Sequence, residues 1–182
     1  MDVLTIKTLK MKRIFSLMIV ALISVPSFGQ ETRLLDTEVA SVAVVANQID
    51  IDYAQIALEK SENKEILDFA NMMVKDHNAV IAQAVALVKK LDVDPKDNVV
   101  SQSLLEDAEK TKRKLKRTSK KKFDAVYIDN EVAYHKAVIG AVKNLLIPET
   151  ENGELKELLS AVVPALEAHL GHAEMVQKNI KG

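Results

Sequence analysis

Four histidines are the residues of this chain whose chemistry stands out. His77 and His169 occupy positions where the helical spacing of their neighbours predicts a buried apolar side chain. His135 follows Glu131 by four positions, which places an imidazole and a carboxylate on one face of a helix. A buried imidazole needs hydrogen-bond partners or a metal ion for its ring nitrogens. Two hypotheses follow: a transition-metal site formed by these three histidines and Glu131, or a satisfied hydrogen-bond network.

Two narrower metal hypotheses have less support. A ferritin-type di-iron centre needs Glu-x-x-His on two helices, and the chain contains no such pair, because Glu131 is followed at the third position by Tyr134. His169 and His172 stand three positions apart and could bind copper together with nearby methionines. Methionine in a helical stripe, however, more often fills the core. The chain has no Cys, which excludes disulfides and thiolate metal sites.

The composition favours an all-helical protein. The chain has 182 residues, with only 5 Gly, no Trp and 4% aromatic residues, and it is rich in residues that favour helices. It contains no nucleophile–base pair, no phosphate-binding glycine loop and no nucleic-acid motif. We therefore expect a binding or structural protein rather than an enzyme, with no nucleic-acid partner.

Residues 1–29 have the pattern of a secretory signal peptide. A basic segment, 11–13, precedes an apolar run, 14–25, and small residues at positions 27 and 29 fit cleavage before Gln30. The alternative is an uncleaved anchor, but the apolar run is shorter than the roughly 20 residues that span a bilayer. We expect an exported domain, 30–182, without a transmembrane span, in the periplasm or associated with the outer membrane.

Hydrophobic periodicity then divides the exported part into helices. Apolar stripes predict four long helices and a less regular shorter one, over 37–60, 63–91, 119–146 and 154–180, with the shorter one at 101–116. The stretch between Leu91 and Ser119 is longer than an up-and-down bundle needs. The expected fold is therefore all-α, a ferritin-like four-helix bundle whose long crossover between the second and third long helices carries a short extra helix.

This arrangement makes a prediction about the histidines. In the crossover topology the second and third long helices run parallel and the fourth runs against them. With about 1.5 Å of rise per residue, His77, His135 and His169 should lie at one level to within about one and a half turns. Rings at one level could bind a shared metal ion or form a hydrogen-bond network with Glu131.

A basic run begins in the shorter helix and continues beyond it. The run from Lys110 to Lys122 holds nine basic side chains and no acidic one, and the remainder of the exported chain has a net charge of −13. Such a charge separation could hold the protein to an anionic envelope surface. The alternative is a solvated crossover helix.

Several segments resemble a known family. They are "ANQIDIDYAQIALEKSEN", "ILDFANMMVKDH", "FDAVYIDNEVAYHKAV" and "VVPALEAHLGHA", in this order along the chain. The chain is identified by them as similar to domain-of-unknown-function family 4142, exported bacterial proteins sometimes labelled outer membrane proteins. The resemblance implies a ferritin-like bundle outside the cytoplasm and places His77, His135 and His169 on the family's histidine positions. It implies no activity, and the basic run departs from the family's pattern.

The leading functional hypothesis is an exported, non-enzymatic binding protein of the cell envelope with a transition metal as its ligand. The first alternative is a structural or stress-related scaffold whose histidines make only internal hydrogen bonds. The second is a redox metalloenzyme. The oligomeric state is left open by the sequence.

Overall fold

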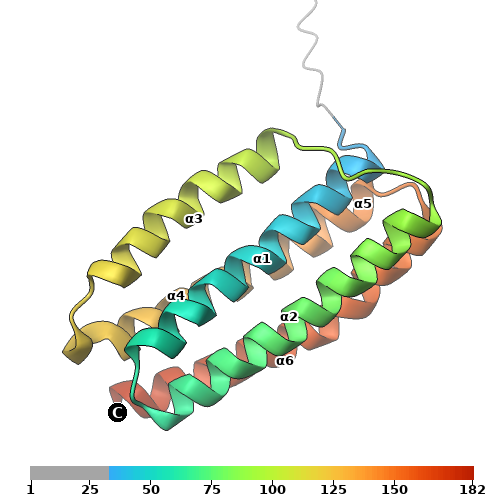
Figure 1. Cartoon of the computed structure of the whole chain (residues 1–182). Coiled ribbons are helices and arrows are strands. Elements are labelled where there is room, and N and C mark those ends of the chain that lie inside the picture. Colours follow the sequence, from blue (N-terminus) through green and yellow to red (C-terminus); the bar gives the residue numbers. More distant parts are fainter. Residues whose placement is uncertain (1–32) are drawn as a thin grey trace, which may run out of the picture. The chain divides into compact units, whose positions relative to one another are not determined.

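The computed structural model of the chain describes residues 33–182, and the regular elements of that part are all helices (Figure 1). The helices are α1 (Asp36–Lys60), α2 (Lys64–Lys90), α3 (Val99–Arg117), α4 (Lys120–Ala141), a π-helical turn η1 (Val142–Leu146), α5 (Ile147–Glu149) and α6 (Gly153–Lys181). The predicted all-α class is confirmed. The signal-peptide prediction, 1–29, and the domain boundary that follows from it lie outside the described residues.

A short turn sets the register of the α1–α2 pair. Asn63 caps α2, because its side-chain oxygen accepts hydrogen bonds from the backbone N–H groups of Glu65 and Ile66. Asn47 lies as far before the last residue of α1 as His77 lies after the first residue of α2. With equal rise per residue, the turn brings these two side chains to the same depth.

The crossover between α2 and α4 is largely helical, as predicted. Asn98 caps α3 by accepting hydrogen bonds from the N–H groups of Val100 and Ser101. The helix then runs back along α1, on which it packs (Figure 1). This cover explains why α1 buries every residue from Val39 to Val42, where a two-sided helix would alternate buried and exposed faces.

The third long helix ends later than the sequence predicts. Its chain stays helical through η1 and α5 to Glu149, so the predicted break at 147–153 begins only at Thr150. Pro148 lies in the last turn of this continuous helical stretch, where its missing N–H removes a backbone hydrogen bond. Thr150 then closes the element, because its backbone N–H and its hydroxyl both donate to the carbonyl of Leu146. Asn152 caps α6.

The core has two parts, which lie on either side of the histidines along the helices. One part is centred on Phe69, Phe123 and Tyr127, all fully buried, and the other on Leu146 and Leu159. Full burial of each such side chain is worth about 1.5–3 kcal/mol. In Figure 1, α2 and α4 run in one direction while α1 and α6 run in the other, which is the crossover connectivity that the sequence predicts. The narrower ferritin-like assignment stays a prediction.

Hydropathy bears on how the described part relates to a bilayer. None of the helices within 33–182 combines the length and the apolar character that crossing a membrane requires.

Candidate metal centre

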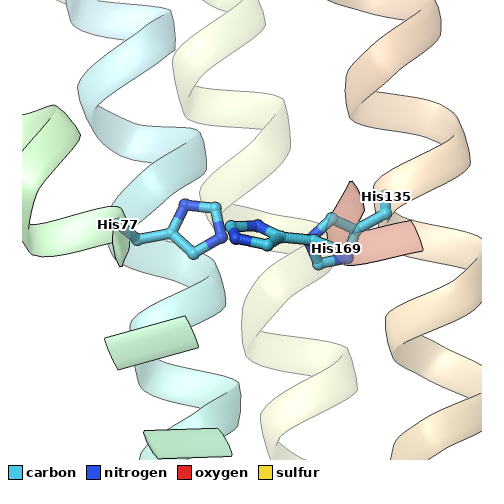
Figure 2. A group of neighbouring side chains, drawn as sticks. All are labelled: His77, His135 and His169. Atoms are coloured by element: carbon cyan, nitrogen blue, oxygen red, sulfur yellow. The ribbon is translucent and has the colours of Figure 1, made fainter. Parts of the chain in front are cut away.

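The three predicted histidines meet inside the bundle. His77 comes from α2, His135 from α4 and His169 from α6, and their rings point toward one another (Figure 2). The ring centroids are 5.3 Å (His77–His169), 5.6 Å (His135–His169) and 5.9 Å (His77–His135) apart. All three side chains are buried. The prediction that they lie at one level is confirmed.

The first ring is held by an amide on the neighbouring helix. His77 Nδ1 lies 2.6 Å from Asn47 Oδ1. The amide orientation follows from its other end, because Asn47 Nδ2 donates to the carbonyl of Ala43 at 2.8 Å. The oxygen of Asn47 therefore faces the ring and accepts the Nδ1–H proton, which leaves Nε2 of His77 as the nitrogen that faces the cluster.

The other two rings are held in the same way. His135 Nδ1 donates to the backbone carbonyl of Glu131 at 3.0 Å, and His169 Nε2 donates to a carboxylate oxygen of Asp76 at 3.1 Å. The remaining nitrogens of His135 (Nε2) and His169 (Nδ1) are buried without a hydrogen-bond partner, and the remaining nitrogen of His77 (Nε2) faces only a carboxylate oxygen of Asp50. Each ring thus has one nitrogen fixed by an acceptor and one nitrogen left over, the arrangement typical of metal-binding histidines.

Burial also favours the form of the ring that binds metals. It lowers the pKa of His135 and the pKa of His169, because a charged imidazolium is poorly solvated inside the bundle. Both rings therefore give up a proton more readily than a free imidazole does, which makes a lone pair available to a metal ion.

Asp50 on α1 adds a carboxylate that the sequence analysis missed. The residue is 0% exposed, and its Oδ2 lies 2.6 Å from His77 Nε2 and 3.5 Å from His135 Nε2. Burial raises the pKa of Asp50, but the neighbouring rings of His77 and His135 outweigh that effect and lower it overall. The ionised oxygen lies at hydrogen-bond distance from Nε2 of His77, and because two lone pairs would repel each other there, a proton or a metal ion lies between them.

A pattern in the sequence could have found Asp50. It stands four positions after Ala46 and four before Ala54, in an apolar row that continues to Ala57. A lone carboxylate in such a row is either buried with partners or misplaced. Asp52, two positions later, gives the segment the pattern of an exposed polar stretch.

Glu131 lies in the cluster, but at its edge. Its side chain is 0% exposed, and its Oε2 is 3.8 Å from Nδ1 of His135, the nitrogen that already donates to the Glu131 carbonyl. It shares a second group with Asp50 and His135, in which one ligand atom from each lies within 4.8 Å of the others. Burial and the charge of Asp50 raise the pKa of Glu131 well above its usual range. Glu131 is therefore the protonated partner of an ionised Asp50, and Asp50 is the better metal ligand of the two.

His172 and Tyr134 do not belong to the cluster. His172 stands apart from the cluster and packs edge-on against Phe69, with ring centroids 5.4 Å apart, so the pairing of His169 with His172 has no support in the geometry. Tyr134 is not a partner of the histidines, because its hydroxyl donates to the carbonyl of Ala46 at 2.8 Å.

The basic run covers the end of α3 and the start of α4. Some of its cations are paired, among them Lys112 with Asp52 at 3.0 Å. Arg113, Lys114 and Arg117 are exposed and form no ion pair within residues 33–182. They occupy neighbouring positions on one face of α3, so the structure gathers a small positive surface there.

Fold and site together define a class: an all-α bundle with a buried cluster of histidines and carboxylates at mid-height. A family model for a domain of unknown function, DUF4142, matches residues 25–176, and the chain belongs to that family. Among curated proteins, none matches the chain. A solved structure with a similar fold is "CopM in the Cu(II)-bound form", with a TM-score of 0.59 and 18% sequence identity, covering 81% of this chain and 98% of that one.

Proposed function

We propose that this protein binds a divalent transition-metal ion at the buried cluster. The ligands are Nε2 of His77, Nε2 of His135, Nδ1 of His169 and a carboxylate oxygen of Asp50, with Glu131 beside them. The observation that carries the proposal is the convergence of the rings: each is fixed through one nitrogen, and one nitrogen of each ring lies within 4.8 Å of a nitrogen of the other two.

The scaffold alternative explains these atoms poorly. Buried polar atoms in folded proteins are nearly all hydrogen-bonded, and leaving one unpaired costs about 1–3 kcal/mol. Here Nδ1 of His169 has no such partner, Nε2 of His135 has only Asp50 Oδ2 at 3.5 Å, and Nε2 of His77 shares that same oxygen at 2.6 Å. A purely structural network leaves these nitrogens poorly paired, whereas one metal ion would satisfy all three.

The donor set indicates which ions to expect. Imidazole nitrogen with carboxylate oxygen suits copper, zinc, nickel and iron, and the absence of Cys argues against a site for Cu(I) held by thiolates. Among divalent ions, copper forms the most stable complexes with such ligands. The similar bundle of CopM was solved with Cu(II), which makes Cu(II) the first ion to test.

Metal content of the untagged protein, purified without chelator, tests the proposal directly. Wild-type protein should carry, or take up from a Cu(II) or Zn(II) titration, one tightly bound ion per chain. His77→Ala and His169→Ala should each abolish that uptake. His172→Ala is the matched control, since it removes an imidazole of the same helix as His169 without touching the cluster. Equal uptake by all four proteins would refute the site.

The place of action is part of the proposal. The pattern of residues 1–29 supports export, and we assign the metal-binding domain to the cell envelope. A second candidate function is attachment to an anionic envelope surface, favoured by the exposed, unpaired side chains of Arg113, Lys114 and Arg117 within the described part of the chain. The two functions are compatible, because that face of α3 does not line the cluster.

A further inference from the structure

The bundle is hollow next to the histidine cluster. A cavity of about 690 Å³ lies among α1, α2, α3, α4 and α6, on the side of the histidines toward the start of α1. Protein interiors are close-packed, and voids larger than a water molecule are few. A volume of this size instead falls within the roughly 300–1,000 Å³ of sites that bind small molecules.

Small side chains create the cavity. Each of the five long helices contributes alanine to its wall, for example Ala43, Ala84, Ala108, Ala137 and Ala161. A helix in a bundle core usually fills the space between helices with larger aliphatic residues. The wall is otherwise mainly Val and Leu, so the site offers a long apolar surface to a ligand.

The cavity is accessible to solvent. Its wall includes exposed residues on four helices: Ala79 and Gln83 on α2, Asp107 on α3, Ala133, Ala137 and Ala141 on α4, and Ala161 and Ala165 on α6. A molecule can therefore enter without unfolding of the bundle.

Charge in the wall restricts the ligand. The charged side chains that line the cavity are Asp50, Asp76 and Asp107, and no Lys or Arg within residues 33–182 lines it. Asp76 is bonded to His169, and Asp107 pairs with Lys110, whereas Asp50 has no counter-charge beyond the histidine rings. An anionic head group would enter an apolar space without a cationic partner and beside the carboxylate of Asp50, which is costly.

We infer that this cavity is a binding site for a molecule with a long hydrocarbon body and no negative charge. One end of the cavity is polar, because His77, His135 and His169 contribute to the wall there. The wall and its charge exist without a metal ion, so the inference stands separately from the proposed metal site. Where both hold, the bound molecule is the neighbour of the metal ion.

A fluorescence titration tests the inference. Metal-free protein, kept in a chelator, is titrated with the uncharged probe N-phenyl-1-naphthylamine, which brightens in apolar surroundings. We expect saturation at one probe per chain and displacement by 1-dodecanol but not by dodecanoate at pH 8. Ala43→Leu and Ala161→Leu, which place larger side chains in the wall, should each weaken binding at least about tenfold.

A matched substitution controls for the added side chain. Ala82→Leu enlarges an exposed alanine of α2 that does not line the cavity, and it should bind the probe like the wild type. Ala161→Leu lies at an exposed position and keeps a good helix former, so it provides a folded test even where Ala43→Leu destabilises the bundle. Absence of saturable binding, or equal binding by all four proteins, would overturn the site. Displacement by dodecanoate as strong as by 1-dodecanol would overturn its charge selectivity. With chelator present throughout, neither result bears on the metal proposal.

Discussion

Replacing Asn47 by Ala should weaken metal binding although Asn47 would not touch the metal ion. Its oxygen lies 2.6 Å from Nδ1 of His77 and holds the proton on that nitrogen, which directs Nε2 into the cluster. Without this acceptor the ring can rotate and can exchange its tautomer. Loss of such an outer partner typically costs about 10–100-fold in metal affinity.

The expected magnitude can be stated as a melting temperature. At free metal about 1,000 times the dissociation constant, binding stabilises the wild type by about 4.1 kcal/mol. An affinity about 10–100-fold weaker leaves about 1.4–2.7 kcal/mol at the same metal concentration. One kcal/mol moves the melting temperature of a chain of this size by about 2–4 °C. The metal-dependent increment should therefore shrink by about 3–11 °C in Asn47→Ala.

Calorimetric melting with Cu(II) and with chelator gives this increment for each protein. Asn78→Ala is the matched control, because Asn78 also donates its side-chain N–H to a carbonyl four positions earlier, that of Val74, but does not contact a ring. In chelator the melting temperatures of the two variants should lie close together, and with Cu(II) they should differ by much more. An increment in Asn47→Ala equal to that of the wild type would refute the account of how His77 is oriented.

Three further outcomes are expected. Glu131→Gln should stabilise the metal-free protein increasingly as the pH rises above 4.5, because folded wild type keeps a Glu131 proton that its unfolded chain loses. The gain in the free energy of unfolding is up to about 1.4 kcal/mol for each pH unit over which this holds. Denaturant titrations from pH 4.5 to 7 measure the difference, and a pH-independent difference would contradict the raised pKa of Glu131. Combined replacement of Arg113, Lys114 and Arg117 by Gln should reduce the fraction of protein that sediments with acidic liposomes. The difference from the wild type should shrink as the salt concentration rises. Absence of liposome binding by the wild type at low salt would count against surface attachment. N-terminal sequencing of exported protein should begin near Gln30, and material retaining residues 1–29 would contradict cleavage.

Much of the architecture followed from the sequence because it depends on local physics. Apolar periodicity located the helices of the described part to within a few residues, apart from the later end of α4 through η1 and α5. Helix rise and connection lengths then set the depth of His77, His135 and His169, since a rigid helix converts residue number into distance. That these rings meet is therefore a property of sequence spacing and of the direction of each helix.

The character of the site depended on contacts between helices, which no local pattern encodes. Asp50 was missed because its burial comes from α2 and α4 packing around α1, while its own segment reads as polar. The ranking of Glu131 behind Asp50 likewise required two carboxyl groups from different helices to lie together, so that one ionises and the other keeps its proton. Neither pKa shift can be inferred from either residue alone.

The sequence by itself determined that this chain forms a helical bundle, that three histidines share one level in it, and that its basic residues gather in one run. Those properties need only the helical repeat, the turn signals and the order of residues. Tertiary structure alone decided which nitrogen of His77 and of His169 is held and which is left over, because Asn47 and Asp76 reach their partners from other helices. Tertiary structure also decided that there is a cavity beside the histidines. A cavity depends on how far apart the helices pack, and that distance depends on the alanines of all the helices together.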